Sequence, residues 1–234
     1  MARNLRKQST QMGIGALLSG SSWFLKLSQA AQEQVRNDVS ETDLVAGASL
    51  GHYGNMQHDW YGVLEGLLKW SIDGPDGRTV SLGGQSVGSW FGEGTLLRGV
   101  PRKANLIALR PTRIAQLPFE TFDWLRQTEP SFNDFLLHQI NERLHWFMGN
   151  YVAHRLGNAD QLVARALVGL LHPLLNPQGQ MKLLISQDEL ANLATVSRQR
   201  CNESLLALRK EGVISGEYGA VQILNLDALQ RWME

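Results

Sequence analysis

The chain has very little cysteine and lacks any long apolar run. Its 234 residues include one cysteine, Cys201, which excludes an intrachain disulfide or a cysteine-ligated iron–sulfur cluster and fits a reducing cytosol. No apolar run approaches the length of a membrane-spanning helix, so we expect no membrane partner and a cytoplasmic location. The histidines form no HExxH motif or Cys/His cluster, and no nucleophile–base set is recognisable. We therefore expect neither a metal site nor a catalytic site.

Neither sign of charge is in excess, because 22 Lys and Arg residues balance 22 Asp and Glu residues. A DNA-binding protein often has a basic surplus, so a net charge of +0 counts mildly against that function. Local clusters of basic residues matter more for DNA binding than the net charge of the whole chain. Hydrophobic residues make up 43% of the chain and charged residues 19%, as in an ordinary globular protein, and the length allows one or two domains.

The first half of the chain predicts a β-rich domain. After an irregular tail over residues 1–11, we expect a short helix near residues 15–27 and a helical stretch over 28–38. Thirteen glycines lie from Gly47 to Gly99, and Gly74 to Gly77 has the Pro-Asp-Gly chemistry of a tight turn. Three stretches rich in β-formers are predicted as strands, namely residues 60–72, 78–84 and 105–117. Short strands with glycine turns favour a jelly roll or barrel.

A helical region follows this domain. Residues 118–128 predict a short helix, and a long helix is predicted from Pro130 to about Arg155. Apolar residues recur along it in steps of three and four, which is the seam of two paired helices: Leu137, Ile140, Leu144, Phe147 and Tyr151. A second apolar face carries Phe132, Phe135, Leu136, Met148 and Val152. Since two apolar faces need two contact surfaces, we favour a homodimer; the alternative is packing within one domain.

The C-terminal third predicts a helix-turn-helix with a hairpin behind it. A helix is expected over residues 161–175, followed by helices over 188–194 and 198–211. Ser197 is a good N-cap for the last of these, and Gly212 is a good C-terminal cap. Residues 213–225 predict two short strands around a glycine turn, and residues 227–232 predict a closing helix. The second helix carries side chains suited to base edges and phosphates: Ser197, Arg198, Gln199, Arg200, Asn202 and Glu203.

Residues 90–104 carry an ordered motif. Phe91-Gly92-Glu93 is followed by an apolar pair, by Gly99, and by Pro101-Arg102. This motif resembles the phosphate-binding cassette of cyclic-nucleotide-binding domains. A guanidinium offers bidentate donors to phosphate oxygens, and a carboxylate accepts from a ribose hydroxyl. The resemblance implies the following effector-binding residues: Gly92, Glu93, Gly94, Thr95, Arg102, Lys103 and, from the long helix, Asn150.

The order of cassette, long helix and helix-turn-helix resembles the CRP/FNR family of bacterial transcription regulators. The resemblance implies an α+β fold with a β-roll (jelly-roll) effector domain over residues 1–128, a dimerisation helix over 129–157 and a winged helix-turn-helix domain over 158–234. It implies a homodimeric, sequence-specific regulator of double-stranded DNA, controlled by cAMP or another cyclic nucleotide, which contacts RNA polymerase if it is an activator. The alternative is a ligand- or partner-binding protein of the same fold that does not recognise DNA.

The cassette departs from the family pattern at three positions. Gly94 and Thr95 stand where cAMP-binding members usually have a leucine and a small residue. Lys103 follows the arginine where a small residue is usual. A second positive charge favours a more anionic ligand, such as a cyclic dinucleotide, unless Lys103 points to solvent.

The helix-turn-helix departs from the pattern as well. Thr195 occupies a turn position that glycine often holds, and this requires no strain if its φ is negative. Gln199 and Glu203 stand where the family usually has a glutamate and an arginine. Because Gln suits adenine and Glu suits cytosine, we expect an operator that differs from the best-known family sites.

Overall fold

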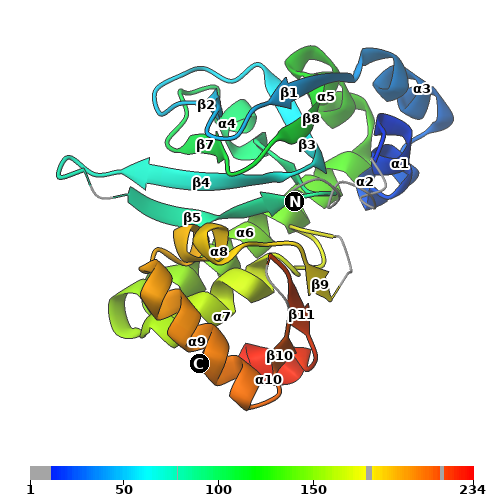
Figure 1. Ribbon diagram of the computed structural model, residues 1–234. Coiled ribbons are helices and arrows are strands. Elements are labelled where there is room, and N and C mark those ends of the chain that lie inside the picture. Colours follow the sequence, from blue (N-terminus) through cyan, green and yellow to red (C-terminus); the bar gives the residue numbers. More distant parts are fainter. Residues whose placement is uncertain (1–11, 78, 178–180, 217–218) are drawn as a thin grey trace, which may run out of the picture.

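The computed structural model describes residues 12–77, 79–177, 181–216 and 219–234, and the tail predicted over residues 1–11 lies outside them (Figure 1). The described chain begins with α1 (Ile14–Ser19), α2 (Ser22–Leu25) and α3 (Gln29–Asp38). The prediction of a single helix over residues 15–27 is therefore wrong. Ser21 lies at the break, where its hydroxyl donates to the carbonyl of Leu17 at 2.7 Å and accepts from the indole of Trp90 at 2.8 Å.

Two antiparallel sheets of four strands each form the N-terminal part. One has the strand order β1-β8-β3-β6, and the other has the order β2-β7-β4-β5. The bounds are β1 (Ser40–Leu44), β2 (Ser49–Gly51), β3 (Asp59–Glu65), β4 (Leu67–Asp73), β5 (Thr79–Ser86), β6 (Trp90–Phe91), β7 (Asn105–Ala108) and β8 (Thr112–Pro118). Buried residues of both sheets, such as Val63 and Leu68, belong to one hydrophobic cluster, so the sheets pack face to face as a β-roll.

Two of the predicted strands are each divided between the two sheets. Residues 60–72 form β3 and β4, with Gly66 at φ +97° between them. A Cβ at this glycine would collide with Thr112 Oγ1, so the corner requires glycine. Residues 105–117 likewise form β7 and β8, on either side of Pro111. The predicted tight turn is present, because the amide of Gly77 donates to the carbonyl of Gly74 at 3.0 Å between β4 and β5.

An aromatic cluster joins the N-terminal helices, the β-roll and the long helix. α5 (Phe119–Thr128) and α6 (Pro130–Leu156) occupy the predicted positions, and α6 begins with the proline that favours a helix start. Trp23, Trp60, Trp90 and Phe132 are all buried, and their rings contact one another at centroid distances of 4.6 to 5.5 Å. The first turns of α6 are therefore fixed to the β-roll.

The C-terminal part is a helix-turn-helix with a small sheet. Its elements are α7 (Ala159–Gly169), β9 (Lys182–Leu183), α8 (Gln187–Ala194), α9 (Arg198–Lys210), β10 (Ile214–Ser215), β11 (Val221–Ile223) and α10 (Leu226–Arg231). The predicted hairpin is present as β10 and β11, and β9, which was not predicted, completes the strand order β10-β11-β9. The helix predicted to reach residue 175 ends at Gly169. The α+β fold class with a winged helix-turn-helix is confirmed.

The helix-turn-helix lies against the β-roll rather than apart from it. Figure 1 shows α8 directly beside β5, and α7 also packs on this strand. Leu67 of β4 belongs to the same buried cluster as Leu170 and Leu193 of the C-terminal part. Within the described ranges, every helix falls short of the length and apolar character that a membrane crossing requires.

Candidate effector site and nucleic-acid interface

The cassette is a sharp corner between a strand and a short helix. β6 ends at Phe91, Gly92 adopts φ +103°, and α4 (Glu93–Arg98) follows. The side-chain amide of Gln57 donates to the carbonyl of Gly92 at 3.0 Å, and a Cβ at Gly92 would collide with that amide. The corner therefore needs glycine, and it directs Glu93 into the protein while Gly94 is exposed and Thr95 half-buried.

Glu93 forms a buried ion pair with the long helix. Its side chain is 2% exposed, and Oε1 accepts from Arg143 Nε at 2.7 Å while Oε2 accepts from Trp60 Nε1 at 3.5 Å. Arg143 Nη2 also donates to the carbonyl of Trp90 at 2.7 Å, and the guanidinium lies 5.0 Å from the ring centre of Trp70. A single arginine of α6 thus holds the cassette helix, the strand before it and β4.

Arg102 is buried without a carboxylate partner. The residue is 5% exposed, and within the described ranges no acidic side chain lies within ion-pairing distance of it. Nη2 donates to the hydroxyl of Tyr61 at 3.2 Å, Nε has no partner, and a Cβ at Gly51 would meet Nε at 2.5 Å. Burial lowers the pKa of the Arg102 guanidinium and raises the pKa of the Tyr61 phenol, because both charged forms lose solvation. A bound anion would supply the missing counter-charge.

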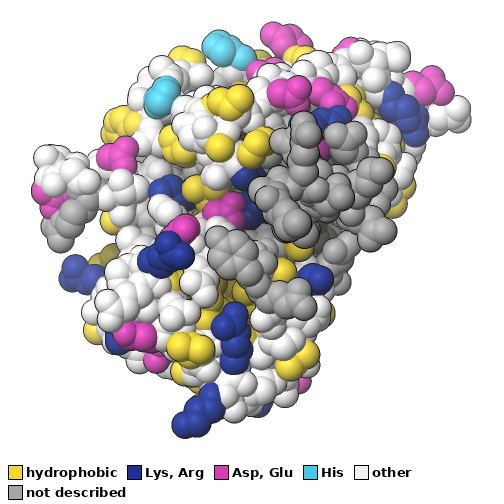
Figure 2. Space-filling model, viewed as in Figure 1, with side chains coloured by type: hydrophobic (Ala, Val, Ile, Leu, Met, Phe, Trp, Pro, Cys, Tyr) yellow, Lys and Arg dark blue, Asp and Glu magenta, His cyan; other side chains and the backbone are white. Residues whose placement is uncertain are grey.

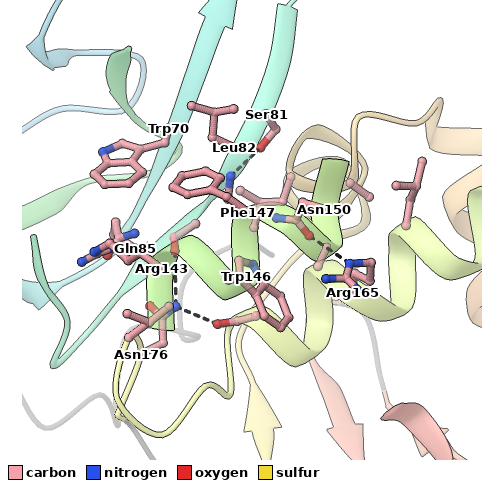
Figure 3. A pocket seen from close by; sticks show the side chains of 18 of the residues that line it. Trp70, Ser81, Leu82, Gln85, Arg143, Trp146, Phe147, Asn150, Arg165 and Asn176 are labelled. Carbon is pink, nitrogen blue, oxygen red and sulfur yellow. Dashed lines mark hydrogen bonds between the residues drawn. The ribbon is translucent and has the colours of Figure 1, made fainter. Parts of the chain in front are cut away.

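Two of the predicted effector residues, Lys103 and Asn150, lie away from the buried Arg102 guanidinium. Lys103 is exposed, with its ammonium 5.6 Å from the ring centre of Tyr53. Asn150 accepts from Arg165 Nε of α7 at 3.0 Å and lines a cavity of about 50 Å³ between β5, α6 and α7 (Figure 3). The α6 residue that reaches the cassette is Arg143, two turns earlier. Arg143 was not predicted as a residue that contacts the cassette. The sequence signal for this contact is its position among the inward-facing residues of α6, not its residue type.

One face of α6 is apolar and exposed. Leu137, Leu144 and Tyr151 are 68%, 57% and 66% exposed, and Ile140 lies on the same face. Phe147 is half-buried, and its ring lies parallel to that of Trp70 with centroids 6.3 Å apart. Both side chains are labelled in Figure 3. Met148 is exposed instead, and so is Val152. The prediction that Met148 and Val152 belong to the same face as buried Phe132 and Leu136 is therefore wrong.

The second helix of the helix-turn-helix presents its polar side chains to solvent. Ser197 accepts from the amide of Arg200 at 3.2 Å, as an N-cap should. Arg198, Gln199, Arg200 and Glu203 are exposed, and Asn202 is half-buried. On the face shown in Figure 2, Lys and Arg side chains lie among acidic and apolar ones over the lower part of the molecule, where α9 runs.

These side chains already have polar partners on α8 and α9. Arg198 Nε lies 3.3 Å from Asp188, and Asn202 accepts from Gln187. Glu203 accepts from Arg200 at 2.6 Å and from Gln199 at 3.1 Å, and these hydrogen bonds lower its pKa. Contacts to base edges would replace these bonds. Burial raises the pKa of the Cys201 thiol, on the opposite face of α9, to about 11, which fits a packing role.

Two family models match the chain in this same order. A cyclic nucleotide-binding domain matches residues 41–129, which include the cassette. A Crp-like helix-turn-helix domain matches residues 161–232, which include α8, α9 and the hairpin, and together the two models cover more than half of the chain. The chain belongs to the CRP/FNR family of transcription regulators. CRP/FNR members are DNA-binding regulators and not enzymes, in agreement with the sequence prediction.

Known proteins resemble this CRP/FNR chain to different extents. It is 28% identical over 178 residues to the transcriptional regulator LdrP of Thermus thermophilus, which covers 73% of this chain and 85% of LdrP. It is 30% identical over 99 residues to the lysophospholipase nte1 of Aspergillus oryzae, a match that covers 42% of this chain but only 6% of that protein. The structure of FixK2 from Bradyrhizobium japonicum has a TM-score of 0.69 at 13% identity and covers 84% of this chain and 98% of FixK2, which indicates a shared fold.

The buried Glu93–Arg143 pair gives a stability prediction. Arg143→Met leaves Glu93 buried without its counter-charge, so we expect the free energy of unfolding to fall by about 3–5 kcal/mol. Adding Glu93→Gln removes the isolated charge and should recover part of the loss. Arg126→Met, which breaks the more exposed Arg126–Asp123 pair on α5, is the control and should cost less than about 1 kcal/mol. Urea unfolding measures all three; equal losses for Arg143→Met and Arg126→Met would contradict the role of the pair.

Proposed function

We propose that this chain is a homodimeric, sequence-specific DNA-binding regulator whose β-roll binds a small anionic effector, with a cyclic nucleotide as the first candidate. The observation that carries the effector proposal is the buried Arg102 guanidinium without a carboxylate partner. We propose the domain limits 1–128, 129–157 and 158–234 for the β-roll, the dimer helix and the DNA-binding part. The protein would act in the cytoplasm, where its DNA is, and would contact RNA polymerase if it activates transcription.

The chemistry around Arg102 favours an anion. Burying a charge without a partner is costly, and a phosphate offsets this cost through charge-assisted bonds to a guanidinium. Nη2 has only the neutral phenol of Tyr61 as a partner, and Nε has none. Lys103, the next residue, is exposed and adds a second positive charge. A ligand with two phosphates would use that charge, so cyclic mononucleotides and cyclic dinucleotides are both candidates.

The path from effector to DNA would run through Arg143. A ligand bound at Arg102 lies in the same cassette as Glu93, and Glu93 is joined directly to α6 by the ion pair. Arg143 also lies over Trp70, whose ring is parallel to that of Phe147. A ligand that favours one arrangement of these groups would shift the population of α6 positions. Because α6 leads into α7 through Gly157 and Asn158, such a shift would alter the placement of the helix-turn-helix.

The exposed face of α6 supports a dimer in which two copies of this helix pair. Leucine, isoleucine and tyrosine side chains on one face of a 27-residue helix lose contact with water when they pack on a second copy. We propose a seam of Leu137, Ile140, Leu144, Met148 and Tyr151, with Met148 in the place that the sequence pattern gave to Phe147. The dimer would place two α9 helices for half-sites one DNA turn apart, about 34 Å.

The effector proposal predicts a ligand-dependent rise in melting temperature that requires Arg102. A ligand at 100 times its dissociation constant stabilises the folded state by about 2.7 kcal/mol. We expect cAMP, cGMP or cyclic di-GMP to produce such a shift in the wild-type chain and none in Arg102→Ala. Arg98→Ala, which removes an exposed arginine at the end of the cassette helix α4, should respond like wild type.

Differential scanning fluorimetry with the three nucleotides measures these shifts. A shift that survives Arg102→Ala would place the ligand elsewhere. If none of the three nucleotides shifts the wild-type chain, the cyclic-nucleotide assignment is wrong.

The seam predicts that Leu144→Asp is a monomer. In a paired helix this aspartate would face its own symmetry copy in an apolar contact, where two like charges lose solvation and repel. Val45→Asp, at an exposed apolar position between β1 and β2, is the matched control and should remain a dimer. Sedimentation velocity measures the mass of each variant, and a dimeric Leu144→Asp chain would rule out this seam.

A further inference from the structure

The free edge of β5 is closed by side chains from the helix-turn-helix part. β5 is the last strand of its sheet, and an edge strand leaves amides and carbonyls without ladder partners. The side chain of Asn176 accepts from the amide of Ser86 at 2.8 Å. It also donates to the carbonyl of Gly84 at 3.3 Å (Asn176 is labelled in Figure 3). Further along the edge, the buried amide of Ser81 donates to the hydroxyl of Thr195 at 3.1 Å.

Thr195 has an unusual backbone for its type. Thr195 is the C-cap of α8, and its backbone is left-handed, at φ +55°. No other non-glycine residue in the described ranges has a positive φ. The φ of Thr195 is therefore not negative, and the condition for a turn without strain is not met. A β-branched residue is strained in this conformation, whereas glycine adopts it freely. Glycine has no hydroxyl, however, and the hydroxyl is the group that reaches Ser81.

Other contacts hold the same helix on the β-roll. Arg110, between β7 and β8, donates to both carboxylate oxygens of Glu189 at 2.6 Å, and this carboxylate also completes the capping box of α8 with Ser186. A Cβ at Gly84 would meet Leu170 and Leu193 at 3.0 and 3.1 Å, so β5 and the C-terminal part approach closely. These contacts make α8 and its turn a second attachment, distant in sequence from the Gly157–Asn158 link.

We propose that Thr195 is a positioning residue for DNA recognition. Its hydroxyl holds the turn of the helix-turn-helix on the edge of β5, and α9 begins three residues later, so the β-roll sets the orientation of the recognition helix. Arg198, Gln199, Arg200 and Glu203 of α9 stay exposed in this arrangement, so the contact presents these side chains rather than covering them. This inference rests on the DNA binding of the proposed function.

Two substitutions separate the hydroxyl from the backbone strain. Thr195→Val keeps the shape and the β-branch but removes the hydroxyl, and Thr195→Ser keeps the hydroxyl. We expect faster hydrogen exchange at the Ser81 amide in Thr195→Val and wild-type exchange in Thr195→Ser. For the DNA measurement, the wild-type protein first selects a duplex from a random library. We expect Thr195→Val to bind this duplex roughly two- to tenfold more weakly, which is the range for one lost hydrogen bond. The serine variant should bind like wild type.

The DNA affinities and the hydrogen-exchange rates of the Thr195 variants test separate parts of this proposal. Wild-type affinity of Thr195→Val overturns the positioning role, and tighter binding shows that the contact restrains α9, which also overturns it. Unchanged Ser81 exchange in Thr195→Val means that the hydroxyl does not close the edge of β5. If the wild-type chain selects no duplex, the DNA-binding proposal fails, and Ser81 exchange still decides whether Thr195 holds the turn on the β-roll.

Discussion

The buried ion pair between Glu93 and Arg143 is the contact on which the arrangement of the two halves depends. It joins α4, the short helix of the cassette, to α6, the helix that connects the β-roll with the DNA-binding part. An ion pair buried this deeply contributes little net stability over an apolar pair, but it leaves few alternative positions for either partner. Because Arg143 also bonds the carbonyl of Trp90, a change in the cassette changes the environment of α6 directly.

A second connection runs through the sheet that contains β4 and β5. Trp70 of β4 lies under Arg143 and parallel to Phe147, and β5, its neighbour, carries the helix-turn-helix on its free edge. The recognition helix is thus attached to the β-roll twice, once through α6 and once through α8. Two attachments at separate points define the orientation of α9 better than one. The proposed dimer would need such a defined orientation to recognise two half-sites.

Local signals in the sequence predicted the parts of the fold that local chemistry decides. Ser197 as N-cap, the turn after β4, the start of α6 at Pro130 and the order of the cassette residues each depend on a few neighbours. The predictions that were wrong concern features that depend on contacts between residues far apart in sequence. Gly66 divides one apolar run between two sheets because Thr112 of another strand leaves no room for a side chain. The inward direction of Arg143 and the positive φ of Thr195 likewise go with partners far away in sequence, Glu93 and Ser81.

We propose that the cassette and the recognition helix are coupled, and coupling between two binding sites is reciprocal. The direct test is to measure the dissociation constant of the cyclic nucleotide that stabilises the chain, with and without a saturating amount of the selected duplex, by isothermal titration calorimetry. We expect DNA to change the nucleotide affinity by about 5- to 150-fold, and the nucleotide to change the DNA affinity by the same factor. Equal nucleotide affinities with and without DNA would contradict it.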